Sequence, residues 1–298
     1  MTPSAPPLTL NELFRLSGIA EKDVLVFRHR PYEPDLNRVF DWIVAERPDL
    51  FQCYQSNHGS RTESALGRAH YVASFIRHTP GTALFTGFYE VVSSRLLSVE
   101  ECMNRPLHRE LMQFGMSGIK ATEGREGVLE FDMPLTDWHA EWRGKLIIKW
   151  PGLERSWYRW ADRNEFSIEA IAQENLLTPN MPGWDRLTVN WKELALLPAS
   201  WCAQLREWRG VYLIIDQSDG KQYVGSACGS ENILQRWKDY ARTGHGGNKL
   251  LRERDPSTFR FSILQRVSPD LPIADVGRIE TSWKERLRTR VPDGLNEN

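Results

Sequence analysis

Four side chains in the last third of the chain have types and spacings suited to chemistry on a phosphate group. Tyr212 and Tyr223 each stand next to a short glycine-containing run rich in β-branched residues, Arg236 follows shortly after, and Glu280 comes later. A guanidinium forks onto phosphate oxygens, and a carboxylate can hold a divalent cation. A phenol, with an ordinary pKa of about 10, takes up a proton only when a nearby positive charge helps it to ionise.

The elements that must position these groups can be predicted from the sequence. Residues 210–225 contain two strand-like runs around Ser218-Asp219-Gly220, which predicts a β-hairpin. Both tyrosines then lie on adjacent antiparallel strands and share a face if they occupy matching positions of the ladder. Residues 231–242 predict a helix that carries Arg236. Ile279, Trp283 and Leu287 have helical spacing, with Glu280 at the edge of their stripe.

This combination resembles the GIY-YIG nuclease family. The two tripeptides of the family stand here as Gly-Val-Tyr at 210–212 and Tyr-Val-Gly at 223–225, followed in order by Arg236, Glu280 and Asn296. The resemblance covers residues 208–298 and leaves residues 1–200 unassigned. It implies a small three-stranded antiparallel sheet with flanking helices, and catalytic roles for Tyr212, Tyr223, Arg236, Glu280 and Asn296.

Phosphodiester hydrolysis needs an activated water, charge neutralisation on the phosphoryl oxygens and help for the leaving oxygen. The resemblance implies that Glu280 holds one divalent cation, Mg²⁺ or Mn²⁺, and that one tyrosine takes a proton from the attacking water. We assign the base to Tyr212 and the orientation of the phosphate to Tyr223. Arg236 would contact the scissile phosphate, and Asn296 would hold Glu280 or substrate.

Each of these residues also has an ordinary structural explanation. Glu280 could be a solvated helix carboxylate paired with Lys284 at i+4. The two tyrosines could fill the core, and Arg236 could be an exposed helix residue. Asn296 could belong to a frayed tail, in which Asn298 is a competing candidate.

Further residues of this region are candidates for catalysis or for DNA contact. Tyr240 lies one helical turn after Arg236, where some relatives have histidine, and His245 lies in a glycine-rich stretch at 243–249. Residues 209–298 hold 15 Lys and Arg against 12 Asp and Glu, an excess of three positive charges. If they share a face, the following side chains would form a basic rim for the DNA backbone: Lys221, Lys238, Arg242, Lys249, Arg252 and Arg254.

The rest of the chain predicts a β-rich α+β domain over residues 1–200, which could divide near residue 120 into two subdomains. Strands are predicted at 24–28, 71–76, 82–92, 128–132 and 144–150, an alternating segment at 51–55, and helices at 34–46 and 98–114. Thr9 and Glu12 predict a capping box at the start of a further helix. We expect a curved sheet or partial barrel. Ser200 is a candidate cap for a helix at 201–208 that leads into the nuclease domain at 201–298.

Composition limits the class of protein. The 298 residues carry a formal net charge of −1, so no overall basicity indicates nucleic acid. The four cysteines lack metal-site spacing and favour reduced thiols. The sequence shows neither a signal peptide nor an apolar run long enough for a membrane span. We therefore expect a cytoplasmic protein.

Twelve tryptophans are many for this length. A cluster of aromatic residues predicts either a core or a pocket that reads a flipped or modified base; the core is the more ordinary outcome. The candidate pocket residues are Trp138, Trp142, Trp157, Tyr158 and Trp160.

The function that the sequence predicts is a metal-dependent DNA endonuclease of restriction or phage-defence type, whose N-terminal domain chooses the target. A structure-specific repair or recombination nuclease, and a nuclease gated by a small nucleotide bound to the N-terminal domain, are the alternatives. One active site cuts one strand, so a cutter of both strands would act as a homodimer or act twice.

Overall fold

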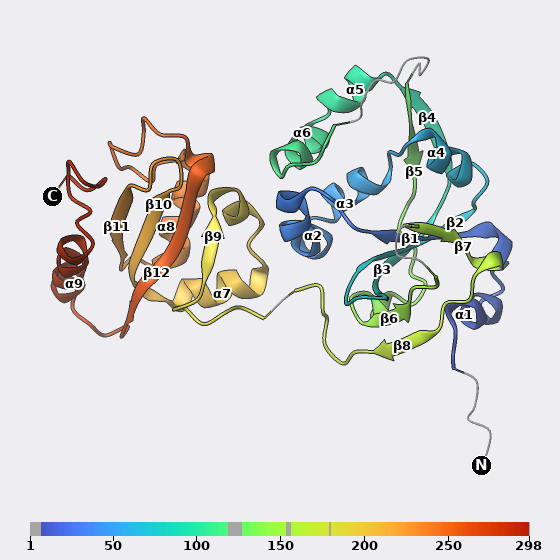
Figure 1. Ribbon diagram of the computed structural model, residues 1–298. Helices are drawn as coiled ribbons and strands as arrows, with labels where there is room; N and C mark the ends of the chain where they lie inside the picture. The colour runs from blue at the N-terminus through green and yellow to red at the C-terminus, as the bar shows by residue number, and fades with distance from the viewer. Residues whose placement is uncertain (1–6, 119–126, 153–155, 179, 298) are drawn as a thin grey trace, which may run out of the picture. The chain divides into compact units, whose positions relative to one another are not determined.

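The computed structural model describes residues 7–118, 127–152, 156–178 and 180–297. The chain forms two compact units, Met1–Thr178 and Pro179–Asn298 (Figure 1). This division precedes the predicted boundary at residue 200 because Thr188–Asn190 form strand β9, which pairs with β12 of the second unit. Most of the residues before Thr9, the predicted split near residue 120, and Asn298 lie outside the described residues.

The first unit is built on a six-stranded mixed sheet with the order β7-β1-β2-β3-β6-β8. β1 and β2 are parallel, so the chain crosses over between them through α2, α3 and α4. β7 and β8 are edge strands, and the sheet is open where a partial barrel was one expectation. The bounds are β1 Val24–His29, β2 Tyr71–Arg77, β3 Thr82–Glu90, β6 Leu146–Lys149, β7 Tyr158–Trp160 and β8 Ile168–Ile171.

Short helices and a separate hairpin surround this sheet. β4 and β5 pair with each other alone in a two-stranded sheet. Several helices have the predicted starts: α2 begins at Pro34 and ends at Glu46 as expected, and α1 has the capping box of Thr9 and Glu12. The remaining bounds are α1 Leu10–Leu16, α3 Pro48–Gln55, α4 Ser60–Leu66, α5 Val99–Asn104, α6 Pro106–Gln113, β4 Ser93–Leu97, β5 Val128–Asp132, and the 3₁₀ turns η1 Glu21–Asp23, η2 Ala140–Trp142 and η3 Ala161–Arg163.

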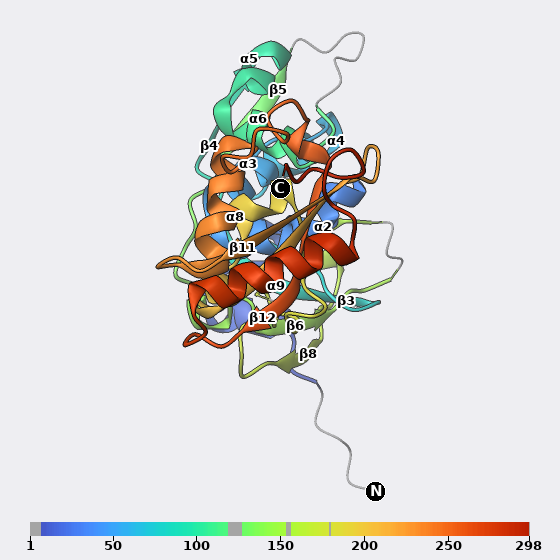
Figure 2. The ribbon, with the colours of Figure 1, turned by 90° about the vertical axis from the view of Figure 1, so that its left-hand side faces the viewer.

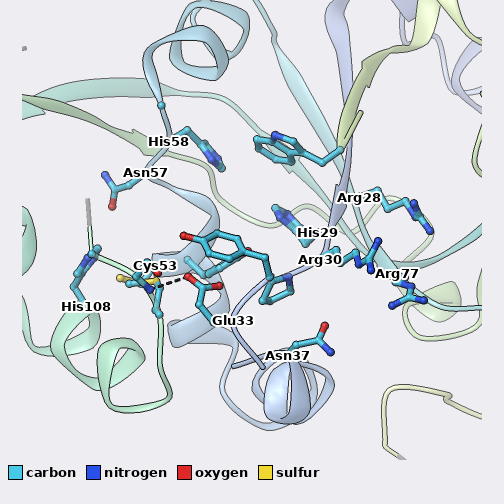
Figure 3. Close-up of a pocket in the computed structure, with 18 of the residues that line it drawn as sticks. Arg28, His29, Arg30, Glu33, Asn37, Cys53, Asn57, His58, Arg77 and His108 are labelled. Atoms are coloured by element: carbon cyan, nitrogen blue, oxygen red, sulfur yellow. Dashed lines mark hydrogen bonds between the residues drawn. The ribbon is translucent and has the colours of Figure 1, made fainter. Parts of the chain in front are cut away.

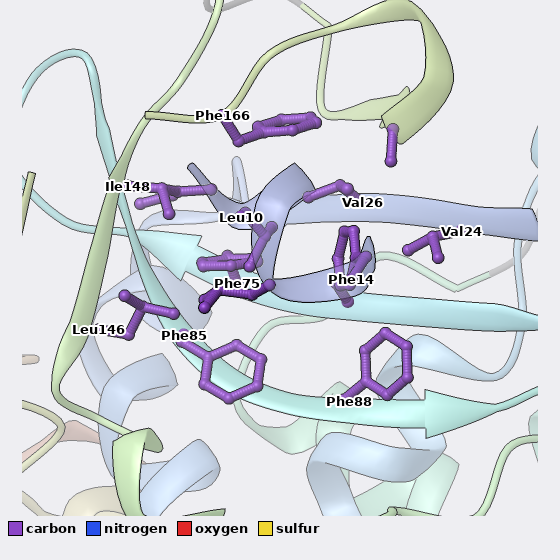
Figure 4. Packing of buried hydrophobic residues seen from close by; sticks show 14 of the residues in the cluster. Leu10, Phe14, Val24, Val26, Phe75, Phe85, Phe88, Leu146, Ile148 and Phe166 are labelled. Carbon is purple, nitrogen blue, oxygen red and sulfur yellow. The ribbon is translucent and has the colours of Figure 1, made fainter. Parts of the chain in front are cut away.

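The core of the first unit lies between one face of the sheet and α1. Leu10 and Phe14 of α1 are fully buried against strand residues such as Phe75 and Phe85, and Phe166 closes the cluster (Figure 4). The alternation predicted at 51–55 was wrong as a strand signal: these residues end α3, where Phe51 and Gln55 are buried one turn apart. Pro48 at the first position of α3 is a helix-start signal, which the alternation of the following residues outweighed in the prediction.

The second unit is a four-stranded antiparallel sheet with the order β11-β10-β12-β9, so the predicted three strands gain β9 as a fourth. Helices cover both faces. Trp237 and Tyr240 of α8 pack on Phe261, while Val276 of α9 packs on Val211 of the opposite face, and Figure 2 shows α9 from its outer side. The bounds are β9 Thr188–Asn190, β10 Arg209–Asp216, β11 Gln222–Ala227, β12 Phe259–Val267, α7 Ala199–Glu207, α8 Asn232–Thr243, α9 Ile273–Arg286, η4 Trp191–Leu196 and η5 Pro256–Thr258.

Helix α7 starts earlier than the sequence predicts. The residue that caps α7 is Pro198 and not Ser200, so the helix begins before the predicted cap. Among the described residues, no helix combines the length and the apolar character that crossing a bilayer requires.

Candidate active site of the second unit

The hairpin of β10 and β11 places both tyrosines on one face of the sheet. In its register Tyr212 stands opposite Gly225, and Tyr223 stands opposite Ile214, two residues along the same strand. The two rings are therefore diagonal neighbours, with centroids 6.4 Å apart. Tyr212 is fully buried, whereas Tyr223 is partly exposed. Of the two phenols, Tyr223 is the one with solvent access.

Helix α8 brings a guanidinium and a third phenol to the same face. The Arg236 Nε–H donates to the Tyr212 hydroxyl at 3.2 Å, and the Tyr212 and Tyr240 hydroxyls lie 3.1 Å apart. Arg236 and Tyr240 are one helical turn apart, and the guanidinium lies 5.8 Å from the Tyr240 ring centroid. The Tyr212 hydroxyl thus contacts both a cation and a second hydroxyl.

Two glycines make room for these phenols. A Cβ atom at Gly225 would stand 2.5 Å from the Tyr212 hydroxyl oxygen. Gly246, which has a φ of +55°, would bring a Cβ within 2.6 Å of the Tyr240 ring. Position 225 is therefore glycine because the Tyr212 ring occupies the space that a side chain there would need.

Burial decides the protonation of this cluster. Removal from water raises the pKa of Tyr212 well above its ordinary value, the neighbouring Tyr223 adds to the rise, and the positive charge of Arg236 opposes it. The pKa of Tyr240 is raised for the same first reason. Both hydroxyls are therefore protonated at neutral pH in the protein alone, and Arg236 is the group that favours an ionised Tyr212.

Glu280 lies on a different helix, α9. On that helix Ile279 and Trp283 pack on the sheet face opposite to the tyrosines, and the Glu280 side chain is 19% exposed. Its carboxylate pairs with Lys284 at 2.7 Å, which is the helix ion pair that the sequence left open. β11 is the edge strand that contacts both α8 and α9. The described structure thus joins Tyr212, Tyr240 and Arg236 directly, whereas Glu280 lies on the helix that covers the opposite face of the sheet.

Asn296 is buried and hydrogen-bonded, and it does not belong to a frayed tail. Its side-chain oxygen accepts from the Val224 N–H at 3.0 Å and from the Thr289 hydroxyl at 2.7 Å, and its amide donates to the Val224 carbonyl at 2.8 Å. The contacts that the structure shows are with the residue next to Tyr223 and not with Glu280. Asn296 therefore holds the edge strand on which Tyr223 stands.

The remaining candidate residues of this unit differ in the solvent exposure of their side chains. His245 is partly buried, and its Nδ1 accepts from the Gly247 N–H at 3.0 Å, which places its proton on Nε2. Arg254, which the predicted basic rim includes, pairs with the buried Asp216 at 2.6 Å. Of the other predicted DNA contacts, Lys221 is partly exposed and four are exposed: Lys238, Arg242, Lys249 and Arg252.

The aromatic residues predicted for a base pocket separate in the first unit. Trp138 and Trp142 pack against the hydrophobic core, and Tyr158 and Trp160 line a small surface hollow beside Arg68. Trp157 alone of the five lines the large cavity of this unit. Proximity in sequence misled here because these residues sit on separate loops and strands around the sheet.

The model of the GIY-YIG catalytic domain matches residues 209–295, which contain the hairpin, Arg236 and Glu280. Residues 209–295 form a GIY-YIG catalytic domain. The resemblance predicted from the sequence is confirmed, and so is a GIY-YIG-type DNA endonuclease as the class of enzyme.

Two solved structures are similar to the GIY-YIG part of the chain. One is the catalytic domain of the homing endonuclease I-TevI, at 24% identity, covering 30% of this chain and 98% of that one with a TM-score of 0.26. The other is a mutant of the same I-TevI domain, also at 24% identity, covering 30% of this chain and 94% of that one with a TM-score of 0.25. No curated protein matches the chain.

Proposed function

We propose that the chain is a divalent-metal-dependent DNA endonuclease of restriction or phage-defence type, whose first unit chooses the target. The observation that carries the catalytic part is the contact of Arg236 and Tyr240 with the Tyr212 hydroxyl inside a matched catalytic domain. Such a cluster can accept a proton and neutralise an anion at one place.

In this proposal the oxygen of a water attacks the phosphorus while Tyr212, as phenolate, takes the proton from that water. The bond between phosphorus and the leaving sugar oxygen breaks, and the leaving oxygen takes a proton from solvent. Arg236 favours the phenolate and balances charge on the phosphoryl oxygens. Tyr223, which is partly exposed, orients the phosphate at the edge of β11. Tyr240 and His245 remain candidates for supporting roles.

The residues present fit a magnesium ion. Among the described residues, no group of three His, Cys, Asp or Glu side chains could enclose a metal. Mg²⁺ is commonly held by one or two carboxylates, with water and substrate phosphate completing its shell. Glu280, partly exposed on α9, supplies that kind of ligand. When bound, the ion would neutralise charge on the phosphate and the leaving oxygen.

The test of the metal role uses the two partners of one ion pair. Glu280→Ala should abolish cleavage in Mg²⁺, with DNA binding retained, because it removes the ligand and none of the exposed basic residues. Lys284→Ala is the matched control: it breaks the same pair and should leave cleavage largely intact. Equal activity of the two variants would show that the pair is only structural, and cleavage by Glu280→Ala would refute the metal assignment.

The four cysteines are free thiols, which is in keeping with a cytoplasmic enzyme. One active site per chain implies a second copy, or a second event, for double-strand cleavage. A nuclease gated by a small nucleotide is the second candidate, and a large basic cavity in the first unit favours it over a repair nuclease.

A further inference from the structure

A cavity of about 960 Å³ opens at one end of the sheet in the first unit. β1 ends at His29 and β2 ends at Arg77, and both residues line it. These are the two parallel strands of the sheet. Ligands of sheets with parallel strands bind beyond the carboxyl ends of those strands, where the chain leaves the sheet and side chains converge. The cavity thus lies where the topology favours a ligand.

One side of the cavity is strongly basic. Arg28, Arg30 and Arg77 gather there, as Figure 3 shows, and Glu33 is the carboxylate among the lining residues. The Glu33 carboxylate already accepts from the Ser117 N–H at 2.8 Å. The Nε of Arg77 is buried without a hydrogen-bond partner among the described residues. A buried guanidinium N–H without a partner is costly, so this side favours an anion with oxygen acceptors.

The other side is aromatic and neutral. The Trp157 ring centroid lies 5.1 Å from that of His58 and 5.9 Å from that of His29. Burial lowers the pKa of His29 to about 3, with repulsion from His58 adding to the effect, and lowers the pKa of His58 to about 4. Both imidazoles are therefore uncharged at neutral pH, and the positive charge of the cavity comes from its arginines.

The hydrogen bonds of these imidazoles fix their tautomers. His58 Nε2 lies 2.7 Å from the Gln55 carbonyl, which can only accept, so Nε2 carries the proton. The Ser74 hydroxyl donates its hydrogen to the Gln55 side-chain oxygen. It can therefore only accept from His29 Nε2, 3.0 Å away, so this nitrogen also carries the proton. In both rings Nδ1 keeps the lone pair. Imidazole nitrogens of this kind suit the N–H donors of a nucleobase.

A third histidine supplies an unsatisfied group. His108 of α6 is 3% exposed and lines the cavity, and its Nε2 has no hydrogen-bond partner among the described residues. Its Nδ1 faces the Cys102 sulfur at 3.9 Å. Buried polar atoms are almost always paired in native proteins. A ligand in the cavity would supply the missing partner.

We propose that this cavity binds one nucleotide, with its base on the side of Trp157 and the histidines and its phosphate toward Arg28, Arg30 and Arg77. The volume suits a ligand of this size. The nucleotide has two possible sources, a base flipped out of DNA or a free nucleotide. Tyr32, at the cavity and 80% exposed, offers a surface on which a neighbouring base can stack, which favours DNA.

The inference rests on the proposed role of the first unit in choosing the target, and it is tested without cleavage. In Glu280→Ala protein, two probes are compared: the four deoxynucleoside 5′-monophosphates by calorimetry, and labelled duplexes with or without one unpaired nucleotide by anisotropy. Saturable binding of a monophosphate indicates a free nucleotide. Tighter binding of the duplex that has the unpaired nucleotide indicates a flipped one.

Variants then locate the site. Arg77→Gln should weaken whichever binding is seen at least about tenfold, because it removes a charge-assisted contact to phosphate. Arg163→Gln, an exposed arginine of the same unit outside the cavity, should change nothing. Tyr32→Ala, which cannot disturb the core, should weaken duplex binding at least about fivefold if the source is DNA.

Two results would overturn the proposal. One is that neither monophosphates nor the unpaired nucleotide are preferred over paired duplex. The other is an equal effect of Arg77→Gln and Arg163→Gln in proteins with the same melting temperature. Either result leaves the proposed nuclease chemistry untouched, since cleavage by Glu280→Ala and wild type is measured separately.

Discussion

The same small change at three phenols tests which one is the base. Tyr212→Phe, Tyr223→Phe and Tyr240→Phe each remove one hydroxyl and keep the ring. Loss of a positioned general base costs about 10²–10⁴-fold in rate. Tyr240→Phe removes one neutral hydrogen bond to Tyr212, worth about 0.5–1.5 kcal/mol, so it should slow cleavage only about two- to tenfold. Tyr212→Phe should therefore be the severe variant.

The pH profile separates a base from a structural phenol. Because burial raises the pKa of Tyr212 above its ordinary value, the reactive phenolate is a small fraction at neutral pH. That fraction, and with it the cleavage rate, should rise about tenfold per pH unit between about pH 7 and 9. Tyr240→Phe should keep this slope, and Tyr212→Phe should lose it.

The assay is single-turnover cleavage of a labelled duplex at saturating Mg²⁺, with melting temperatures recorded beside it. Tyr212→Phe leaves Arg236 Nε and the Tyr240 hydroxyl without this partner, which should cost about 1–3 kcal/mol of stability. If Tyr212→Phe retains the pH slope while Tyr223→Phe loses it, the base is Tyr223 and our assignment is wrong.

Two further predictions concern stability. Asn296→Ala should lower the free energy of unfolding by about 2–4 kcal/mol, measured by denaturant titration, because it leaves buried backbone groups of Val224 unpaired; lost cleavage at unchanged stability would instead show a direct catalytic role. Burial opposes ionisation of Asp216, but hydrogen bonds from Ser218, Arg254 and Thr258 lower its pKa from 3.8 to about 2. Its stabilisation is therefore present above about pH 4 and lost as pH falls toward 2, so the melting temperature of Asp216→Asn should change less over that range than that of wild type.

Local signals in the sequence predicted much of the second unit. Alternation of β-branched residues around Ser218-Asp219-Gly220 determines the hairpin, since register follows from a short turn. The capping box at Thr9 and the proline at Pro34 likewise mark helix starts that the structure confirms. These features depend on residues a few positions apart, which interact in the same way in almost any fold.

Other predictions failed because they required long-range contacts. Phe51–Gln55 alternate in polarity but form part of a helix, since one side of α3 packs in the interior. Four of the five predicted pocket aromatics lie elsewhere, whereas Arg77 and His108 line the cavity without any signal that joins them in sequence. No local pattern could place the ends of β1 and β2 beside α6.

The sequence by itself determined the kinds of candidate catalytic groups, their order and the hairpin that carries two of them. The tertiary structure decided which groups touch: Arg236 contacts Tyr212, and Asn296 holds Val224, whereas Glu280 lies on a helix that covers the sheet face opposite to the tyrosines. The reason is that hairpins and caps arise from neighbours in the chain, while the burial of a hydroxyl or an amide depends on packing between distant segments.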